Sequence, residues 1–440
     1  MAEQMKPSGI DWIGDIPKSW KVTRLQTLFD QVKDKNSGTK EKNLLSLSYG
    51  KIVKKDIEGA FGLIPESFDT YNIIKKNDIV LRLTDMQNDQ VSLRTGLVKE
   101  EKGIITSAYV TIRLKCGSPS YYHWYLYAFD TSKQIYAFGQ GVRQSLTFEE
   151  LKKMLILLPS PKEQQAIADF LDEECAQIDS IAADLEKQIA LLQQYKKSLI
   201  TETVTKGLDK SVPMKDSGVE WIGEIPVGWE LSRIKYLTDN HHPYPIGDGD
   251  HGMIKADDYL TEGIPYIRVL NLTWGSGLNL ENLVFISKEM NSLIKNSELK
   301  PNDILIAKTG ATIGKTAIVP DSLPVSNTTS HVGKITLANV HDAKYFYYVM
   351  TSSIVQKQIQ DISAMQSTRP ELGIEGLKNL ILTVPPFDIQ QHIARFLDDH
   401  CAKIDRVLHE KGKQLSVIKQ HKKSLIYEYV TGKKRVKEVR

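Results

Sequence analysis

The chain carries an internal duplication, and this feature most limits how its 440 residues can fold. Residues 6–28 and 215–237 share 11 identities in 23 positions without a gap. Residues 158–207 and 384–433 share 23 identities in 50 positions at a constant offset of 226. A similar helical composition would not by itself keep the pentapeptide KKSLI at the same place in both copies. We therefore read the chain as two units, each a body followed by a helical arm.

The bodies, 1–158 and 212–384, are predicted to be mixed α/β domains. Short apolar stretches such as NDIVLRL, YVTIRL, IPYIRVL and NDILIA have the length and β-branched content of strands, and Gly, Asn and Asp separate them. The aromatic segments 121–129 and 345–350 are expected to pack against these strands as helices. The second body is the longer one, with its additional residues within 238–298.

The arms, 159–207 and 385–432, are predicted to be long helices that begin at prolines. Aliphatic residues recur every seven positions in the first arm: Leu171, Ile178, Leu185, Leu192 and Leu199. The second arm repeats this stripe with one break: Leu397, Ile404, Lys411, Ile418 and Leu425. One such helix is unstable alone, and the other arm is the simplest partner. Two units related by a pseudo-two-fold axis would make the arms an antiparallel coiled coil between the bodies. No disulfide is then expected between Cys175 and Cys401.

Each body opens with the pattern WIGxIPxxW, whose apolar residues we expect in the core. They are Trp12, Ile13, Ile16 and Trp20 in the first copy, and Trp221, Ile222, Ile225 and Trp229 in the second. The basic tail, 433–440, is expected to be a solvated end.

The composition is that of a globular protein, and its net charge of +3 permits a nucleic-acid partner without requiring one. Three cysteines without a CxxC pair fit a reducing compartment and argue against a cysteine zinc site. No apolar run reaches the 18 residues of a membrane span, and the start has no apolar segment of a secretory signal. We expect a cytoplasmic protein without a membrane partner.

Three motifs that suggest chemistry fail on inspection. TGATIGKT at 309–316 misses the phosphate-loop spacing by one residue, so we read it as strand, turn and strand with a basic tip at Lys308 and Lys315. VPPF at 384–387 lacks the polar first residue of the amino-methyltransferase loop. GDGDHG at 247–252 lacks EF-hand ligand spacing, and no histidine has metal-ligand spacing. We predict no catalytic residue and no metal site.

The ordered set of repeated motifs resembles the specificity subunit of type I restriction-modification enzymes. The resemblance covers nearly the whole chain and includes both WIGxIPxxW entrances, GIPYIRVLNL, LKPNDILIAKTGATIGKTAIV, LPSPKEQQAIADFLDEECAQID and the repeated KKSLI. One departure is that Glu163 of the first arm has no acidic counterpart at Ile389 of the second.

The resemblance implies a non-catalytic subunit in which each body is a target recognition domain that reads half of a bipartite, asymmetric DNA target. The arms would be spacer helices that fix the distance between half-sites and dock two methyltransferase (modification) subunits. S-adenosylmethionine is expected in those subunits, ATP and Mg in the restriction subunits, and no cofactor on this chain.

Candidate DNA contacts lie on predicted loops beside strands, where polar and basic side chains can reach base edges or phosphates. In the first body they are Arg82, Gln87, Asn88, Arg94, Arg143 and Gln144. In the second they are Asp250, His251, Arg268, Lys308, Thr309, Lys315 and Arg369. Arg143 and Arg369 share the offset of 226, so the same phosphate-positioning role is expected for both.

Two other readings stay open from the residues alone. One is a two-headed scaffold whose arms bind another protein and which has no DNA role. The other is a homodimer in which the coiled coil joins arms of different chains.

Overall fold

The computed structural model describes most of the chain, which forms two compact units. The described residues are 4–55, 67–84, 86, 93–137, 145–275, 277–364 and 370–436. The first unit comprises Met1–Glu186 with Lys413–Arg440, and the second is Lys187–Gly412. Each unit therefore holds one body and a part of both arms, because both long helices cross from one unit into the other.

The body of the first unit is built on a four-stranded antiparallel sheet with strand order β4-β11-β8-β9. Its strands are β4 (Phe29–Gln31), β11 (Val110–Leu114), β8 (Ile79–Leu81) and β9 (Thr95–Leu97). Four antiparallel pairs flank it: β1 (Met5–Pro7) with β2 (Asp15–Pro17), β3 (Lys21–Arg24) with β12 (Leu155–Leu158), β5 (Leu45–Ser48) with β6 (Lys51–Lys54), and β7 (Asn72–Lys75) with β10 (Lys102–Ile105). Its helices are α1 (Leu25–Leu28), α2 (Pro119–Thr131) and α3 (Phe148–Leu151).

The second body repeats this plan. Its central sheet has the order β16-β22-β19-β20, with β16 (Ile246–Asp248), β22 (Val332–Ile335), β19 (Ile304–Ala307) and β20 (Thr316–Ile318). The pairs β13 (Met214–Asp216) with β14 (Glu224–Pro226) and β15 (Glu230–Arg233) with β23 (Ile381–Val384) match the first-body pairs β1–β2 and β3–β12. A three-stranded sheet follows the order β18 (Val284–Ile286), β17 (Ile264–Ile267), β21 (Asn327–Thr328). Two of its strands lie in 238–298, where the sequence has its additional residues.

The helices of the second body are α5 (Lys288–Leu293), α6 (Ala343–Thr351), α7 (Ser353–Ala364) and α8 (Ile374–Lys378).

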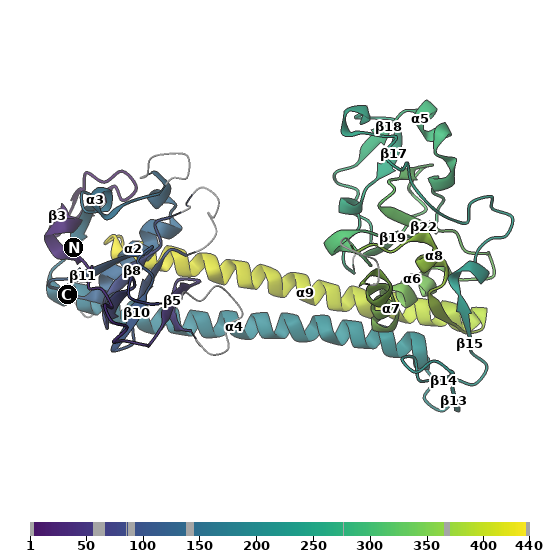
Figure 1. The fold of residues 1–440 in the computed structure, drawn as a ribbon, viewed down its shortest axis with the longest axis horizontal. Coiled ribbons are helices and arrows are strands. Elements are labelled where there is room, and N and C mark those ends of the chain that lie inside the picture. The colour runs from purple at the N-terminus through teal and green to yellow at the C-terminus, as the bar shows by residue number, and fades with distance from the viewer. Residues whose placement is uncertain are drawn as a thin grey trace. The chain divides into compact units, whose positions relative to one another are not determined.

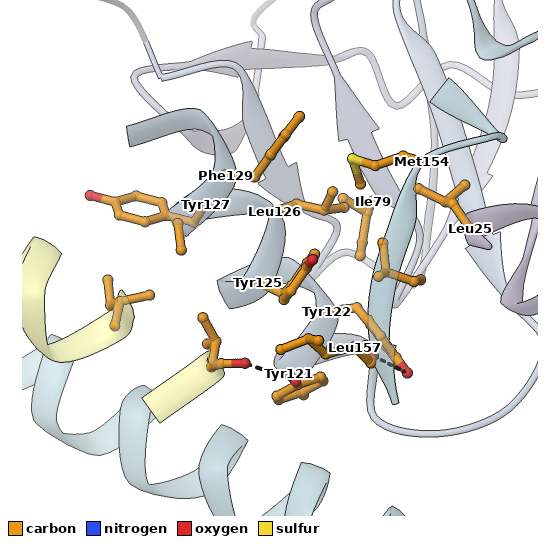
Figure 2. Packing of buried hydrophobic residues seen from close by; sticks show 14 of the residues in the cluster. Leu25, Ile79, Tyr121, Tyr122, Tyr125, Leu126, Tyr127, Phe129, Met154 and Leu157 are labelled. Carbon is orange, nitrogen blue, oxygen red and sulfur yellow. Dashed lines mark hydrogen bonds between the residues drawn. The ribbon is translucent and has the colours of Figure 1, made fainter. Parts of the chain in front are cut away.

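The aromatic segments form the helices α2 and α6, as predicted, and join each body to the arms. Figure 2 shows the tyrosines of α2 packed between the sheet side chains and the arm helices. The Tyr121 hydroxyl donates to the carbonyl of Val430 at 3.0 Å, and in the second unit Tyr345 of α6 lies 3.3 Å from the carbonyl of Val204. The two contacts are equivalent in the repeat.

The arms are the helices α4 (Pro161–Lys206) and α9 (Phe387–Val430), labelled in Figure 1. A capping box starts α4, because Ser160 bonds to the carboxylate of Glu163 through its backbone N–H at 3.0 Å and its hydroxyl at 2.7 Å. Each helix is followed by a glycine with positive φ, Gly207 at 71° and Gly432 at 74°. A Cβ on Gly432 would lie 2.5 Å from Pro17, so the end of α9 packs closely on the first WIGxIPxxW segment.

Within each unit the arm segments run antiparallel, as the sequence predicts. In the first unit Asp179 pairs with Lys422 at 2.6 Å and Glu186 with Lys419 at 2.7 Å. In the second unit Gln188 accepts from Lys411 at 2.6 Å and Lys196 pairs with Asp405 at 2.6 Å. Along these four pairs the residue number on α4 increases while the number of its partner on α9 decreases, which is the pattern of antiparallel helices. Lys411, the break in the heptad stripe, reaches out of the seam to Gln188.

The entrance residues lie in the cores with one exception. Ile13, Ile16 and Trp20 are buried, as are Ile222, Ile225 and Trp229, and Trp12 packs on the first core. The prediction is wrong for Trp221, which is 51% exposed. In the first unit, the ring of Trp12 meets Tyr125, Phe129 and Tyr427. Thr201 stands at the repeat position of Tyr427, which is one physical reason why Trp221 stays uncovered.

Candidate nucleic-acid interface

The arms hold each body through side chains that occur at the same place in both repeats. Gln164 accepts from the backbone N–H of Ser118, the cap of α2, at 3.0 Å, and donates to the carbonyl of Pro159 at 3.0 Å. Gln390 makes the same two bonds, with Asp342 and Pro385, at 2.9 and 2.8 Å. Any surface on a body is thereby fixed relative to the arm segment in its own unit.

Asp172 and Asp398 form a second such pair, about two turns further along each arm. Asp172 accepts from the indole of Trp124 at 2.7 Å and from the Ser120 hydroxyl. Asp398 accepts from the hydroxyl of Tyr348 at 2.8 Å and pairs with Lys344 at 2.7 Å. These carboxylates are not among the residues predicted from the sequence. The signal that could have identified them is that both repeats have aspartate at this position, at the offset of 226.

The first predicted contacts lie where β8 and β9 approach each other. Arg82 follows β8 directly and is half-buried, and its backbone N–H donates to the carbonyl of Arg94 at 2.8 Å. Arg94 is fully buried: its guanidinium donates to the carbonyls of Arg82 and Thr84 at 3.2 and 3.0 Å and to the Tyr136 hydroxyl at 3.2 Å. Arg94 therefore holds the two strand ends together, and we remove it from the candidate DNA surface.

Lys308 also has a structural role. It follows β19, its side chain is 3% exposed, and it pairs with Asp248 at the end of β16. A buried charge is stable only with a partner, so this pair ties together two strands of the second sheet that are separated by β22. The predicted strand, turn and strand at 304–318 is confirmed, but of its two predicted basic residues only Lys315 retains solvent exposure.

Asp250 organises a loop and is not exposed. Its carboxylate accepts from the backbone N–H groups of Ile254 at 2.9 Å, Gly252 at 3.2 Å and Ser330 at 3.3 Å, and the residue is 4% exposed. Burial acts to raise the pKa of Asp250, but these donors outweigh it and the pKa lies below its ordinary value. We remove Asp250 and Lys308 from the candidate DNA surface.

The loop fixed by Asp250 presents His251, whose side chain is 67% exposed. His251 has a positive φ of 47°, uncommon for a residue other than glycine, and its Nε2 lies 3.2 Å from Asp248. By fixing the loop, Asp250 keeps the neighbouring His251 side chain exposed.

The remaining described candidates are half-buried, with part of each side chain open to solvent. Thr309 lies beside Glu371 and its hydroxyl is 3.2 Å from Nδ1 of His331. Arg268 stacks over the ring of Tyr259 at 5.4 Å and donates to the carbonyl of Asn282 at 3.2 Å. Gln87, Asn88, Arg143, Gln144 and Arg369 lie outside the described residues.

The start of the C-terminal tail is docked, which corrects the expectation of a solvated end. Arg435 pairs with Glu163 and lies 5.7 Å from the ring centroid of Trp20, whose indole donates to the same carboxylate at 3.2 Å. Lys433 donates to the carbonyl of Asp15 at 2.5 Å. Glu163, which lacks an acidic counterpart in the second arm, therefore has a structural role of its own.

The described part of the chain holds no group of three or more His, Cys, Asp or Glu side chains placed to bind a metal ion. None of its helices is long and apolar enough to cross a bilayer.

Comparison with known proteins decides the family. The model of the type I restriction modification DNA specificity domain matches this chain twice, at residues 17–191 and 246–416. The chain belongs to this family. The specificity subunit of the type I restriction enzyme MjaVIII of Methanocaldococcus jannaschii is 23% identical over 96% of this chain and 95% of its own length. The specificity subunit of EcoBI of Escherichia coli is 26% identical over 65% of this chain and 60% of its own.

A solved structure supports the fold assignment. It concerns complex assembly and conformational transition of the type I R-M system, and one of its chains matches with a TM-score of 0.67 and 14% identity, over 94% of this chain and 98% of that one. The duplicated mixed α/β architecture predicted from the sequence is therefore that of the specificity-subunit family.

Proposed function

We propose that the chain is the non-catalytic DNA-specificity subunit of a type I restriction-modification complex, and that its bodies, 1–158 and 212–384, are target recognition domains. Each would read one half of a bipartite asymmetric site in double-stranded DNA. The observation that carries the proposal is the contrast inside the duplication: arms that align without a gap and share 23 of 50 residues hold bodies with different loops. Different loops suit different base sequences, whereas matching arms suit matching partners.

The proposed DNA surface consists of the candidates that keep solvent exposure together with those outside the described residues. Of the described ones, His251 is exposed and Arg82, Arg268, Thr309 and Lys315 are half-buried; the others are Gln87, Asn88, Arg143, Gln144 and Arg369. A good base contact contributes about 1–3 kcal/mol of discrimination, so three or four in each body suffice for a specific site. The net charge of +3 is small, and partner subunits would supply much of the contact with the phosphate backbone.

The arms, 159–207 and 385–432, are proposed as spacers that fix the half-site separation and dock two modification subunits. Matched exposed side chains support two equivalent docking surfaces, one in each unit. The first surface comprises Ile181, Asp184, Gln414, Val417 and His421. The second comprises their repeat equivalents Val407, Glu410, Gln188, Leu191 and Tyr195. Each surface combines side chains of α4 and α9.

The members of a surface lie on one side of the arm pair. Glu186 and Lys419, which pair with each other, directly follow seam residues and mark one side. Ile181, Gln414 and His421 directly precede Ala182, Leu415 and Lys422, which are half-buried between the stripe residues, and so lie on the other side. The apolar members are uncovered, with Ile181 51%, Val417 65%, Val407 37% and Leu191 54% exposed. An acidic residue at the same place in each surface suits a basic group on the partner.

The modification subunits would carry S-adenosylmethionine, and the restriction subunits would use ATP and Mg. A two-headed protein scaffold without a DNA role is the second candidate, and the exposed apolar arm residues also suit it. The different surfaces of the two bodies favour the DNA reading.

Methylome sequencing of a host with and without this gene tests the proposal. We expect one split methylated motif that depends on the gene, with two half-sites at a constant spacing. A host in which no methylated motif changes would refute the DNA-specificity function.

A further inference from the structure

A hairpin of the first body ends in an exposed tyrosine with an unusual backbone conformation. Strands β5 and β6 are joined by only two residues, Tyr49 and Gly50, with φ values of 48° and 77°. These values belong to the tight hairpin turn in which both central residues have positive φ and Asn-Gly is the preferred pair. Tyr49 is 84% exposed, so no packing of its ring compensates for this conformation.

The choice of tyrosine has no explanation within the fold. A bulky residue with positive φ is strained, whereas asparagine adopts the same conformation readily. Strained residues that persist at exposed positions occur preferentially at functional sites, and here the strain holds an aromatic ring out in solvent.

The hairpin is anchored at its base and along its length. Leu45 is 2% exposed in a core cluster with Ile74 and Val80. A Cβ on Gly96 of β9 would lie 2.7 Å from Leu47, so the hairpin packs directly on this strand. A Cβ on Gly50 would lie 2.9 Å from Leu93, which places the tip beside the residues that precede β9.

This position connects the tip to the proposed DNA surface. Leu93 is next to Arg94, whose backbone pairs with that of Arg82. The β8–β9 connection also carries Gln87 and Asn88, which lie outside the described residues. The hairpin was not among the sequence-based candidates, because a tyrosine before a glycine between two short strands carries no distinctive pattern.

The strand after the turn is basic. Lys51 and Lys54 lie in β6 and Lys55 follows it, and all three are exposed. None of the three forms an ion pair with another residue in the described ranges. Their charges are therefore available to an anionic partner.

We propose that Tyr49 contacts bases in the half-site read by the first body, with Lys51, Lys54 and Lys55 on the adjacent phosphates. The proposal rests on the proposed function. A two-stranded ribbon fits the major groove of B-form DNA, and an apolar ring at its tip can meet thymine methyl groups and base edges.

The test compares Tyr49→Asn, which suits the turn and removes the ring, with Tyr49→Phe, which keeps the ring. Tyr236→Asn is the matched control, because Tyr236 is 71% exposed with Lys235 beside it, 5.2 Å from the ring centroid, in the second unit. Each full-length variant replaces the gene in the host for methylome sequencing. Each purified chain is also melted and titrated with a 40-bp duplex that bears the wild-type motif.

We expect Tyr49→Asn to melt at or above the wild-type temperature, to bind the duplex about tenfold more weakly, and to relax one position in one half-site. Tyr49→Phe and Tyr236→Asn should resemble wild type. Lys315→Gln, in the second body, should affect the other half-site. It therefore shows which half-site each body reads.

Unchanged motif and affinity in Tyr49→Asn would overturn the proposal, as would a change in the half-site that Lys315→Gln affects. A lower melting temperature that accompanies the lost affinity would assign Tyr49 a structural role and would also overturn it. If the wild-type gene directs no split motif, the proposed function itself fails, which is a separate result.

Discussion

At the scale of single residues, burial separates charged side chains that build the protein from those available to a partner. Lys308 and Lys315 belong to the same turn region, yet Lys308 is 2% exposed and bonded to Asp248 whereas Lys315 keeps solvent exposure. Both are lysines beside a predicted turn, as expected of a DNA contact, and the sequence alone does not show which of the two is exposed. Their substitutions should therefore affect different properties.

Lys308→Met should remove the buried ammonium partner of Asp248 at the end of β16 and lower the free energy of unfolding by about 3 kcal/mol. Lys315→Met should change it by less than about 0.5 kcal/mol. Urea unfolding of the full chain measures both values. Equal effects of the two substitutions would contradict the structural assignment of Lys308.

The three cysteines should differ in reactivity for the same reason. Burial raises the pKa of Cys175 to about 12 and that of Cys401 to about 11, so both thiols stay protonated at pH 8. Cys116 is exposed. Iodoacetamide at pH 8 should modify Cys116 alone in the native protein and all three cysteines in urea, as measured by mass spectrometry. Rapid native labelling of Cys175 would contradict the packing described here.

At the scale of elements, the register of the arms is set by two equivalent ion pairs at partly buried positions. Asp179 with Lys422 and Asp405 with Lys196 join the same two repeat positions in the two units, and the lysine side chains are only 14% and 12% exposed. Lys422 also lies 5.7 Å from the ring centroid of Trp124. Shifting either helix by one turn would separate both pairs, so the pairs oppose slippage of an otherwise weak heptad seam.

Asp179→Lys should destabilise the protein by about 1 kcal/mol, because it removes the partner of Lys422, whose side chain is only 14% exposed, and places a second positive charge beside it. Adding Lys422→Asp should restore a large part of that loss, since the opposite charges meet again. Thermal unfolding of the two single variants and the double variant measures the coupling. Additive losses would show that the two side chains do not interact. Asp184→Lys, at an exposed position of the same helix, is the control.

At the scale of the whole molecule, the duplication should fix the number of partners. One chain carries two copies of the proposed docking surface, each with two exposed aliphatic residues from different arms. We expect two modification subunits for each copy of this chain, and an equal contribution of the two surfaces.

Ile181→Asp with Val417→Asp should remove one modification subunit, because buried carboxylates at an apolar interface are costly. Val407→Asp with Leu191→Asp should remove the other. Ala183→Asp, on the exposed face away from these surfaces, should leave both bound. Native mass spectrometry of the co-expressed complex counts the subunits. Two retained subunits in both double variants would exclude these surfaces.

The duplication, the two helices, their antiparallel direction and most of the entrance core could be predicted from the amino-acid sequence. These features depend on local periodicity and on repeated residues, which a single chain displays directly. The repeated tyrosines of α2 and α6 and the prolines before the arms follow the same logic.

Which polar residues are buried became known from the folded structure and not from the sequence. Arg94, Asp250 and Lys308 lie on loops that look exposed in the sequence, but strands from distant parts of the chain surround them and supply their partners. The docking of Arg435 on Glu163 joins residues 272 positions apart, and Trp221 is exposed whereas its counterpart Trp12 packs against Tyr427, 415 positions away in the chain. Burial and pairing are set by contacts between remote segments, and no pattern within one segment records them.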